Sequence, residues 1–168
     1  WFGSDSFTYR ANDGALDSGV VTVTLSVAPV NDRPLAAIDA ASTNEDTPVA
    51  GNVLANDSDI EGDALTATLV TGPAHGTLVF GADGSYTYKP AADFSGSDSF
   101  SYQAHDAQAD SDVQSVNLTV SAVNDAPTAN ADTASTAINT ALPSIAVLAN
   151  DTDADGDTLT VTSATLAN

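Results

Sequence analysis

The stretch Gly96-Ser97-Asp98-Ser99-Phe100-Ser101-Tyr102 occurs almost unchanged near the start of the chain, as Gly3-Ser4-Asp5-Ser6-Phe7-Thr8-Tyr9. From residue 3 to residue 96 the spacing is 93 residues. The linker 30–34 recurs at the same spacing as 123–127, and residues 53–59 recur as 147–153 with one residue inserted. A fixed spacing of this length indicates tandem repeats of domain size rather than a propeller or a solenoid. We therefore predict the end of one repeat in residues 1–30, a whole repeat in 31–123 and the start of a third in 124–168.

Apolar and polar residues alternate along several segments of this repeat. Val116, Leu118 and Val120 share one face of such a segment, while the residues between them are polar. A period of two residues is typical of a half-buried strand. The alternation of apolar and polar residues in the complete repeat predicts seven strands, near 36–42, 48–54, 64–70, 76–81, 85–89, 98–104 and 113–121. Seven short strands predict an all-β, immunoglobulin-like sandwich, with the last two strands in 1–30 and the first three in 124–168.

Composition and charge exclude several classes of protein. The 168 residues include 3 Lys and Arg against 23 Asp and Glu, giving a formal net charge of −20. Such a surface repels nucleic acids and anionic lipid headgroups, and no apolar run approaches the ~20 residues of a membrane helix. The absence of cysteine excludes disulfides and thiolate zinc sites. The chain begins at Trp1 without a recognisable signal peptide, and we expect it to be a piece of a longer protein.

Acidic residues are concentrated between the second and third predicted strands. They form the run Asn56-Asp57-Ser58-Asp59-Ile60-Glu61-Gly62-Asp63, which recurs as Asn150-Asp151-Thr152-Asp153-Ala154-Asp155-Gly156-Asp157. Acids at alternate positions followed by glycine resemble the first half of an EF-hand calcium loop. The position that would carry the final glutamate is Thr68 or Thr162 instead. Calcium prefers about 6–8 oxygen ligands, so a complete site needs further ligands from elsewhere in the fold.

The sandwich topology predicts where these further ligands lie. Loops that follow the second and sixth strands share the end at which the first strand enters, and the loop after the first strand lies at the opposite end. Acidic turns are also ordinary solvated surface, which is the alternative interpretation. We predict one Ca²⁺ site at each junction between repeats. The first would use Asn31, Asp32, Asp57, Asp59, Glu61, Asp63 and Asp106, and the second Glu45, Asp46, Asn124, Asp125, Asp151, Asp153, Asp155 and Asp157.

Several of these motifs resemble a known family. The segments Ala11-Asn12-Asp13-Gly14 and Ala104-His105-Asp106 are similar to the Ala-x-Asp motif of cadherins, and the linker Val-Asn-Asp-x-Pro and Asp57-x-Asp59 are similar to cadherin motifs. The segments 72–78, 83–90 and 94–102 resemble more closely the cadherin-like, bacterial immunoglobulin-like repeats of large bacterial surface adhesins. This resemblance implies tandem cadherin-like sandwiches in an elongated, calcium-stabilised array on the cell surface or in a secreted matrix.

Two functions are compatible with these features. The first is a structural stalk or extender segment of an extracellular bacterial adhesin or surface fibre, with neighbouring repeats of the same chain or fibre as its partners, and with homotypic or glycan contacts. The alternative is a calcium-dependent carbohydrate-binding or cell–cell contact module of a secreted protein. We predict no enzymatic activity, because His75 and His105 lack a nucleophile or an orienting acid at a suitable spacing. The two incomplete ends could also complement each other between chains, but neither contains a match to residues 75–93.

Overall fold

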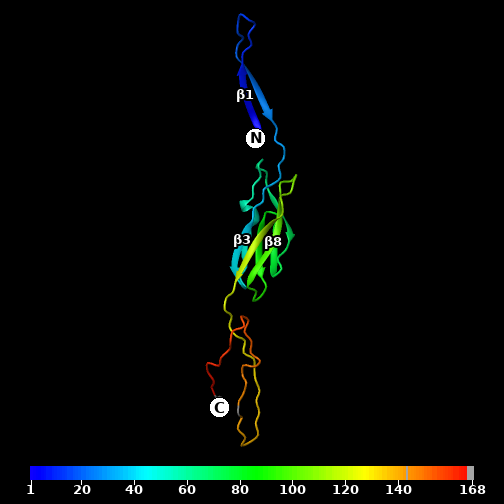
Figure 1. Cartoon of the computed structure of the whole chain (residues 1–168). Coiled ribbons are helices and arrows are strands. Elements are labelled where there is room, and N and C mark those ends of the chain that lie inside the picture. Colours follow the sequence, from blue (N-terminus) through cyan, green and yellow to red (C-terminus); the bar gives the residue numbers. More distant parts are fainter. Residues whose placement is uncertain (143, 166–168) are drawn as a thin grey trace.

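The computed structural model describes residues 1–142 and 144–165. A central β-sandwich lies between an N-terminal hairpin and a C-terminal segment, which extend from its opposite ends (Figure 1). Within the described residues no helix is long and apolar enough to cross a membrane. The elements are β1 Gly3–Tyr9, β2 Val21–Val27, β3 Asp39–Asn44, β4 Val49–Asn52, a 3₁₀ turn Val53–Asn56, β5 Thr66–Thr71, β6 Gly76–Phe80, β7 Ser85–Pro90, β8 Gly96–His105 and β9 Gln114–Ser121.

Two sheets form the sandwich. One has four strands in the order β3-β9-β8-β5, and the other has three strands in the order β4-β7-β6. Strands β3 and β9 run parallel, while all other neighbours run antiparallel. The prediction of a seven-stranded, all-β sandwich is therefore confirmed. The proposed division into repeats at residues 30 and 123 stays a prediction.

The core lies between the sheets and consists mainly of the apolar residues that alternate along β7, β8 and β9, together with Ala36, Val53 and Ala67. Phe100 is 2% exposed, and its ring meets the rings of Phe80 and Tyr86 edge-on at centroid distances of 6.0 and 5.1 Å. The inward residues of β9, from Val116 to Val120, are buried as their period of two predicts. Burial of these aromatic and aliphatic side chains holds the two sheets together.

The hydroxyl of Tyr102 connects three elements at one end of the core. Its oxygen lies 3.0 Å from the backbone oxygen of Val53, 3.0 Å from Asp57 Oδ2 and 3.2 Å from Asp39 Oδ2. These groups belong to the 3₁₀ turn, to the loop before β5 and to β3. Burial, together with the two neighbouring carboxylates, strongly raises the pKa of Tyr102, so the hydroxyl keeps its proton and remains a donor.

Replacing Asp39 with asparagine is expected to stabilise the sandwich at neutral pH. Burial first, and then the charge of Asp57, raises the pKa of Asp39 above its usual 3.8. Because the pKa of this carboxyl is higher in the folded state than in the unfolded state, its contribution to stability is fully present below pH 3.8. That contribution is lost as the pH rises through the pKa of the folded state. Asparagine keeps an acceptor for Tyr102 and removes the charge. In urea unfolding, Asp39→Asn should have a higher free energy of unfolding than wild type at pH 7. The difference between the two should be smaller at pH 3. An advantage that grows on acidification would contradict the explanation.

Two local details depend on specific backbone contacts. Gly84 closes the β6–β7 turn with φ 79°, and a Cβ there would lie 2.6 Å from Asn52 Oδ1, which explains why glycine occupies the position.

Strand β3 begins at Asp39, three residues later than predicted. Upstream of it, Leu35 bridges to Ser58 and the Ala37 N–H donates to Asp57 Oδ1, so this stretch bonds the acidic loop rather than β9.

The C-terminal segment forms no strand among its described residues and has one isolated bridge, between Thr128 and Thr152. The sequence predicts three strands there, and this prediction is wrong. The reason lies in the pairing of the complete repeat, where β3 pairs with β9, β4 with β7 and β5 with β8. Each of the first three strands therefore needs a partner from the second half of the repeat. Residues 124–142 and 144–165 match only the first half, so their extended segments have no sheet to join.

Candidate metal centre

The acidic loop is organised by hydrogen bonds from its own backbone. Asp59 Oδ1 accepts from the N–H groups of Glu61 at 3.0 Å and Asp63 at 3.1 Å. Gly62 adopts φ 79°, a left-handed conformation that favours glycine. In the second copy of the loop, Asp153 Oδ1 accepts from residues 155 and 157 at 3.1 and 3.0 Å. Both loops are thus folded alike, although only the first belongs to a complete sandwich.

Each linker is bonded to its acidic loop in the same way. The Asp32 N–H donates to Glu61 Oε2 at 3.1 Å, and the Asp125 N–H donates to Asp155 Oδ2 at 2.7 Å. Asn31 and Asn124 each donate to the backbone oxygen of the following residue. The linker and the alternate acids therefore form a local unit whose bonds run through the loop and not through the sheets.

Asp57 and Asp151, which the acidic runs predict as calcium ligands, accept hydrogen bonds within their own repeats. Asp57 Oδ1 accepts the Ala37 N–H at 2.8 Å, and the same carboxylate lies beside the Tyr102 hydroxyl. Asp151 Oδ1 accepts the Asn130 N–H at 2.7 Å. Each carboxylate thus holds, by a backbone hydrogen bond, the stretch of chain that precedes the position of the first strand in its repeat.

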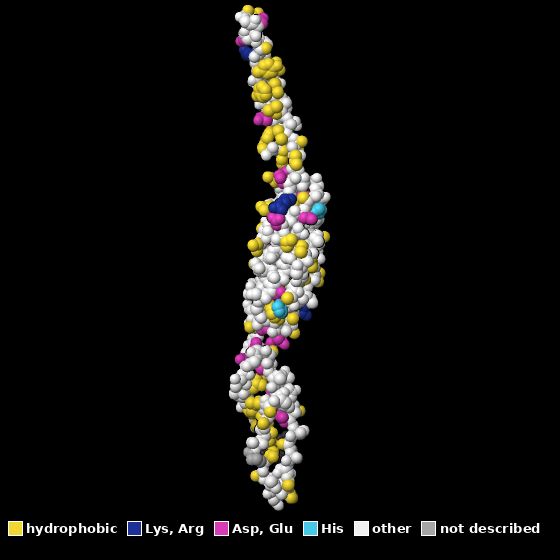
Figure 2. All heavy atoms as spheres, turned by 45° about the vertical axis from the view of Figure 1, so that its right-hand side comes forward, with side chains coloured by type: hydrophobic (Ala, Val, Ile, Leu, Met, Phe, Trp, Pro, Cys, Tyr) yellow, Lys and Arg dark blue, Asp and Glu magenta, His cyan; other side chains and the backbone are white. Residues whose placement is uncertain are grey.

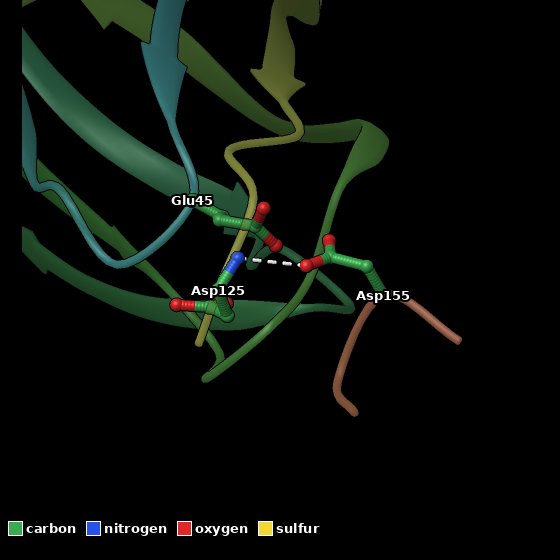
Figure 3. A group of neighbouring side chains, drawn as sticks. All are labelled: Glu45, Asp125 and Asp155. Atoms are coloured by element: carbon green, nitrogen blue, oxygen red, sulfur yellow. Dashed lines mark hydrogen bonds between the residues drawn. The ribbon is translucent and has the colours of Figure 1, made fainter. Parts of the chain in front are cut away.

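At the second junction, acids from the sandwich and from the C-terminal segment meet. One carboxylate oxygen from each of Glu45, Asp125 and Asp155 lies within 4.8 Å of the others. Figure 3 shows Asp125 and Asp155 joined by the backbone hydrogen bond, with the Glu45 side chain directed toward them. Glu45 is buried and also accepts a hydrogen bond from the Val123 N–H. In Figure 2 acidic side chains gather at this narrow part of the molecule.

A second triad shares Asp125. Oxygens of Asp46, Asp93 and Asp125 also lie within 4.8 Å of one another. Asp125 Oδ2 is buried without a hydrogen-bond partner, and burial followed by the charges of Asp155, Asp93, Glu45 and Asp46 raises the pKa of Asp125. Closely spaced carboxylates with an unsatisfied buried oxygen repel one another, and a divalent cation would relieve this repulsion.

Asp93 was absent from the predicted ligands. It lies between β7 and β8, at the end of the sandwich that also presents the β3–β4 turn with Glu45 and Asp46. Both Asp46 and Asp93 adopt left-handed backbone conformations, with φ 57° and 56°. The signal was available in the sequence, because a seven-strand sandwich places the loop after its fifth strand at the same end as the loop after its first.

The first junction is organised differently. Asn31 donates to Asp106 Oδ2 at 3.0 Å and accepts from Gln108 at 2.8 Å. Hydrogen bonds from Ala109, Gln108 and Asn31 lower the pKa of Asp106 despite its burial. Within the described residues no acidic triad as close as those of the second junction forms here. By the repeat spacing, Trp1 matches Phe94. The residues of the first repeat that would correspond to Glu45, Asp46 and Asp93 at this junction are therefore not among the 168 residues.

Replacing Ala107 with glycine is expected to stabilise the sandwich by about 0.5–1 kcal/mol. Ala107 adopts φ 79°, which is strained for any residue with a Cβ, and its counterpart in the first repeat is Gly14 with φ 98°. The neighbouring Asp106 should keep its bonds to Gln108 and Ala109. Urea unfolding at fixed calcium measures the change, with Ala109→Gly as a control outside the left-handed region. A loss of stability in Ala107→Gly would contradict the strain argument.

Both histidines have neighbours that explain their positions. The ring of His75 stacks on Phe94 at a centroid distance of 4.4 Å. His105 Nδ1 lies 3.0 Å from the carboxylate of Asp110 and 3.0 Å from the backbone oxygen of Ala109.

The sandwich, the Asn-Asp linkers and the acidic loops define a bacterial immunoglobulin-like protein with a cadherin-like fold. The sequence matches the bacterial Ig domain family over residues 31–119 and 124–168, which is most of the chain, and the chain therefore belongs to this family. No curated protein matches the sequence. A family and fold of this kind fit a structural or adhesive role outside the cell.

Solved structures with similar folds include human mucin-like protocadherin EC1-2. It has a TM-score of 0.52 and 19% sequence identity, over 72% of this chain and 69% of that one. The endo-fucoidan hydrolase MfFcnA4 from glycoside hydrolase family 107 has a TM-score of 0.42 and 21% identity, over 73% of this chain and 19% of the hydrolase. The chain thus spans about a fifth of that hydrolase. At these identities the protocadherin likeness concerns the fold alone.

Proposed function

We propose that the chain is a structural segment of an extracellular bacterial adhesin or surface fibre, in which calcium bound at the junctions aligns successive immunoglobulin-like repeats into a rod. The observation that supports this most directly is the pair of triads at the second junction. They combine Glu45, Asp46 and Asp93 of the sandwich with Asp125 of the linker and Asp155 of the next acidic loop. A cation held by all three elements would restrict how one repeat turns relative to the next.

The charges at this junction favour a hard divalent cation. All the closely placed ligands are carboxylates, and the linker adds the amide of Asn124. Calcium takes about 6–8 oxygen ligands in flexible geometry, whereas magnesium needs a near-ideal octahedron. Carboxylates from loops on two successive repeats match the calcium preference better. Asp153 and Asp157, which lie in the same loop as Asp155, are further ligands in this proposal.

The first junction would form the same kind of site when a complete repeat precedes it. Asn31, Asp32, Asp59, Glu61, Asp63 and Asp106 are the residues proposed for the downstream side. Asp59 supports this assignment, because its Oδ2 is buried without a hydrogen-bond partner while Oδ1 organises the loop. The upstream side would come from counterparts of Glu45, Asp46 and Asp93.

The role is mechanical rather than catalytic in this proposal, and the partners are the neighbouring repeats. A strand rises about 3.3 Å per residue, so the ten residues of β8 extend roughly 33 Å along one repeat. Pro34 and Pro127 follow the acidic linkers and restrict their backbone. Short linkers of this kind space the repeats at regular intervals when the cation is bound.

Small-angle X-ray scattering of the 168-residue chain tests this proposal. With calcium we expect a longer maximum dimension and a narrower distance distribution than in EGTA, because the bound ion aligns the C-terminal segment with the sandwich. Magnesium at the same concentration is the control and should have a smaller effect. Indistinguishable profiles with calcium and with EGTA would overturn calcium-dependent stiffening.

A further inference from the structure

The loop between β7 and β8 carries Asp93 in a tight turn. The Phe94 N–H donates to the backbone oxygen of Ala91 at 3.2 Å, and Asp93 adopts φ 56° within this turn. A left-handed conformation is unfavourable for a residue with a Cβ, and it persists only where the surrounding structure fixes it. Asp93 supplies one of the three carboxylates of the second triad. The contacts that fix this turn therefore also fix one side of the proposed calcium site.

His75, the residue before β6, contacts the turn at both of its ends. Its backbone oxygen accepts the Ala91 N–H at 2.9 Å. Its ring stacks on the ring of Phe94, with a centroid distance of 4.4 Å and an angle of 3° between the two planes. Phe94 also packs against the core, so the stacked rings connect the turn to the body of the sandwich.

A buried carboxylate holds His75 in place. The Asp98 side chain is 3% exposed, and its Oδ2 accepts the His75 N–H at 2.8 Å and the Tyr88 hydroxyl at 2.9 Å. Burial opposes the charge of Asp98, but hydrogen bonds from backbone N–H groups, including those of Ala74 and His75, lower its pKa, so it is ionised at neutral pH. Asp98 belongs to β8 and Tyr88 to β7, and His75 is thereby attached to both sheets of the sandwich.

We propose that His75 is a positioning residue for the calcium site, which holds the 91–94 turn so that the Asp93 carboxylate lies beside Asp46 and Asp125 before the cation binds. This inference rests on the proposed function, because it concerns the same junction. His75 belongs to neither triad among the described residues, so it acts through the turn and not as a ligand. Apparent affinity falls with the fraction of molecules that adopt the binding conformation, and a turn fixed in advance keeps that fraction high.

Calorimetric titration of calcium into the 168-residue chain tests the role of the ring. His75→Ala should weaken binding roughly three- to fivefold, because fewer molecules hold Asp93 in place. His75→Phe keeps a flat ring over Phe94 and should bind as wild type does, whereas His75→Gln is polar without a ring and should resemble His75→Ala. Thr77→Ala, at an exposed position of β6, is the matched control and should have no effect. Normal affinity in His75→Gln together with a loss in His75→Phe would overturn the stacking argument.

A double-mutant cycle tests whether His75 and Phe94 act through each other. Phe94→Leu removes the second ring of the stack and should weaken calcium binding about as much as His75→Ala. The double variant should lose no more than either single variant, because the contact is already absent in each. Fully additive losses would overturn a shared mechanism.

Amide hydrogen exchange in EGTA tests the positioning without any bound ion. The N–H groups of Ala91 and Phe94 should exchange several-fold faster in His75→Ala than in wild type or His75→Phe, while the amides of β9 keep their protection. Faster exchange throughout β9 would indicate general destabilisation and would contradict a local role. Unchanged exchange at Ala91 and Phe94 would overturn the inference and leave the proposed function intact. Absence of calcium binding by wild type would instead overturn the proposed function, and the exchange rates would still decide whether His75 holds the turn.

Discussion

Replacement of Asp125 with asparagine is expected to weaken calcium binding at the second junction by roughly tenfold or more, because affinity in oxygen sites depends on the number of charged ligands. Asp125 is the residue shared by both triads, and its Oδ2 is buried without a partner. The substitution keeps the size of the side chain and leaves the backbone N–H that donates to Asp155. Calorimetric titration of calcium into each variant measures the change.

Asp32→Asn provides the matched control, since Asp32 occupies the same linker position at the first junction. That junction has no comparable triad among the described residues, so this variant should change the calcium affinity little. Equal losses in both variants would show that binding does not depend on convergence of the two repeats. Unchanged affinity in Asp125→Asn would remove Asp125 from the ligand set.

Truncation of Phe100 to alanine is expected to destabilise the sandwich by about 3–5 kcal/mol, the usual cost of deleting a buried aromatic ring. Phe100 is in edge contact with Phe80 and Tyr86 across the two sheets. Phe7 occupies the same position of the repeat in the open hairpin, and Phe7→Ala should cost about 0.5 kcal/mol or less. Urea unfolding at low concentration compares the two.

This pair separates the effect of sequence from the effect of surroundings, because both residues are phenylalanine within nearly identical heptapeptides. A large loss in Phe7→Ala at low concentration would mean that the hairpin face is covered within a single chain. A loss near zero in Phe100→Ala would contradict the described core.

Much of the fold could be predicted from the sequence because its signals are local. The period of two along Val116, Leu118 and Val120 predicts a buried face, and the 93-residue spacing identifies the repeats. The acidic loops are also local, since Asp59 and Asp153 bond N–H groups two and four residues away and repeat this pattern with or without a sandwich.

The amino-acid sequence is therefore enough to predict the all-β class, the strand pattern of the complete repeat and the position of the acids near its ends. Tertiary structure alone decided that Asp93 joins Asp46 and Asp125, that Asp57 turns toward Tyr102, and that residues 124–142 and 144–165 form no strand. The physical reason is the range of the interactions. Alternation and loop hydrogen bonds depend on neighbours in the chain, whereas strand pairing and converging charges depend on partners tens of residues away.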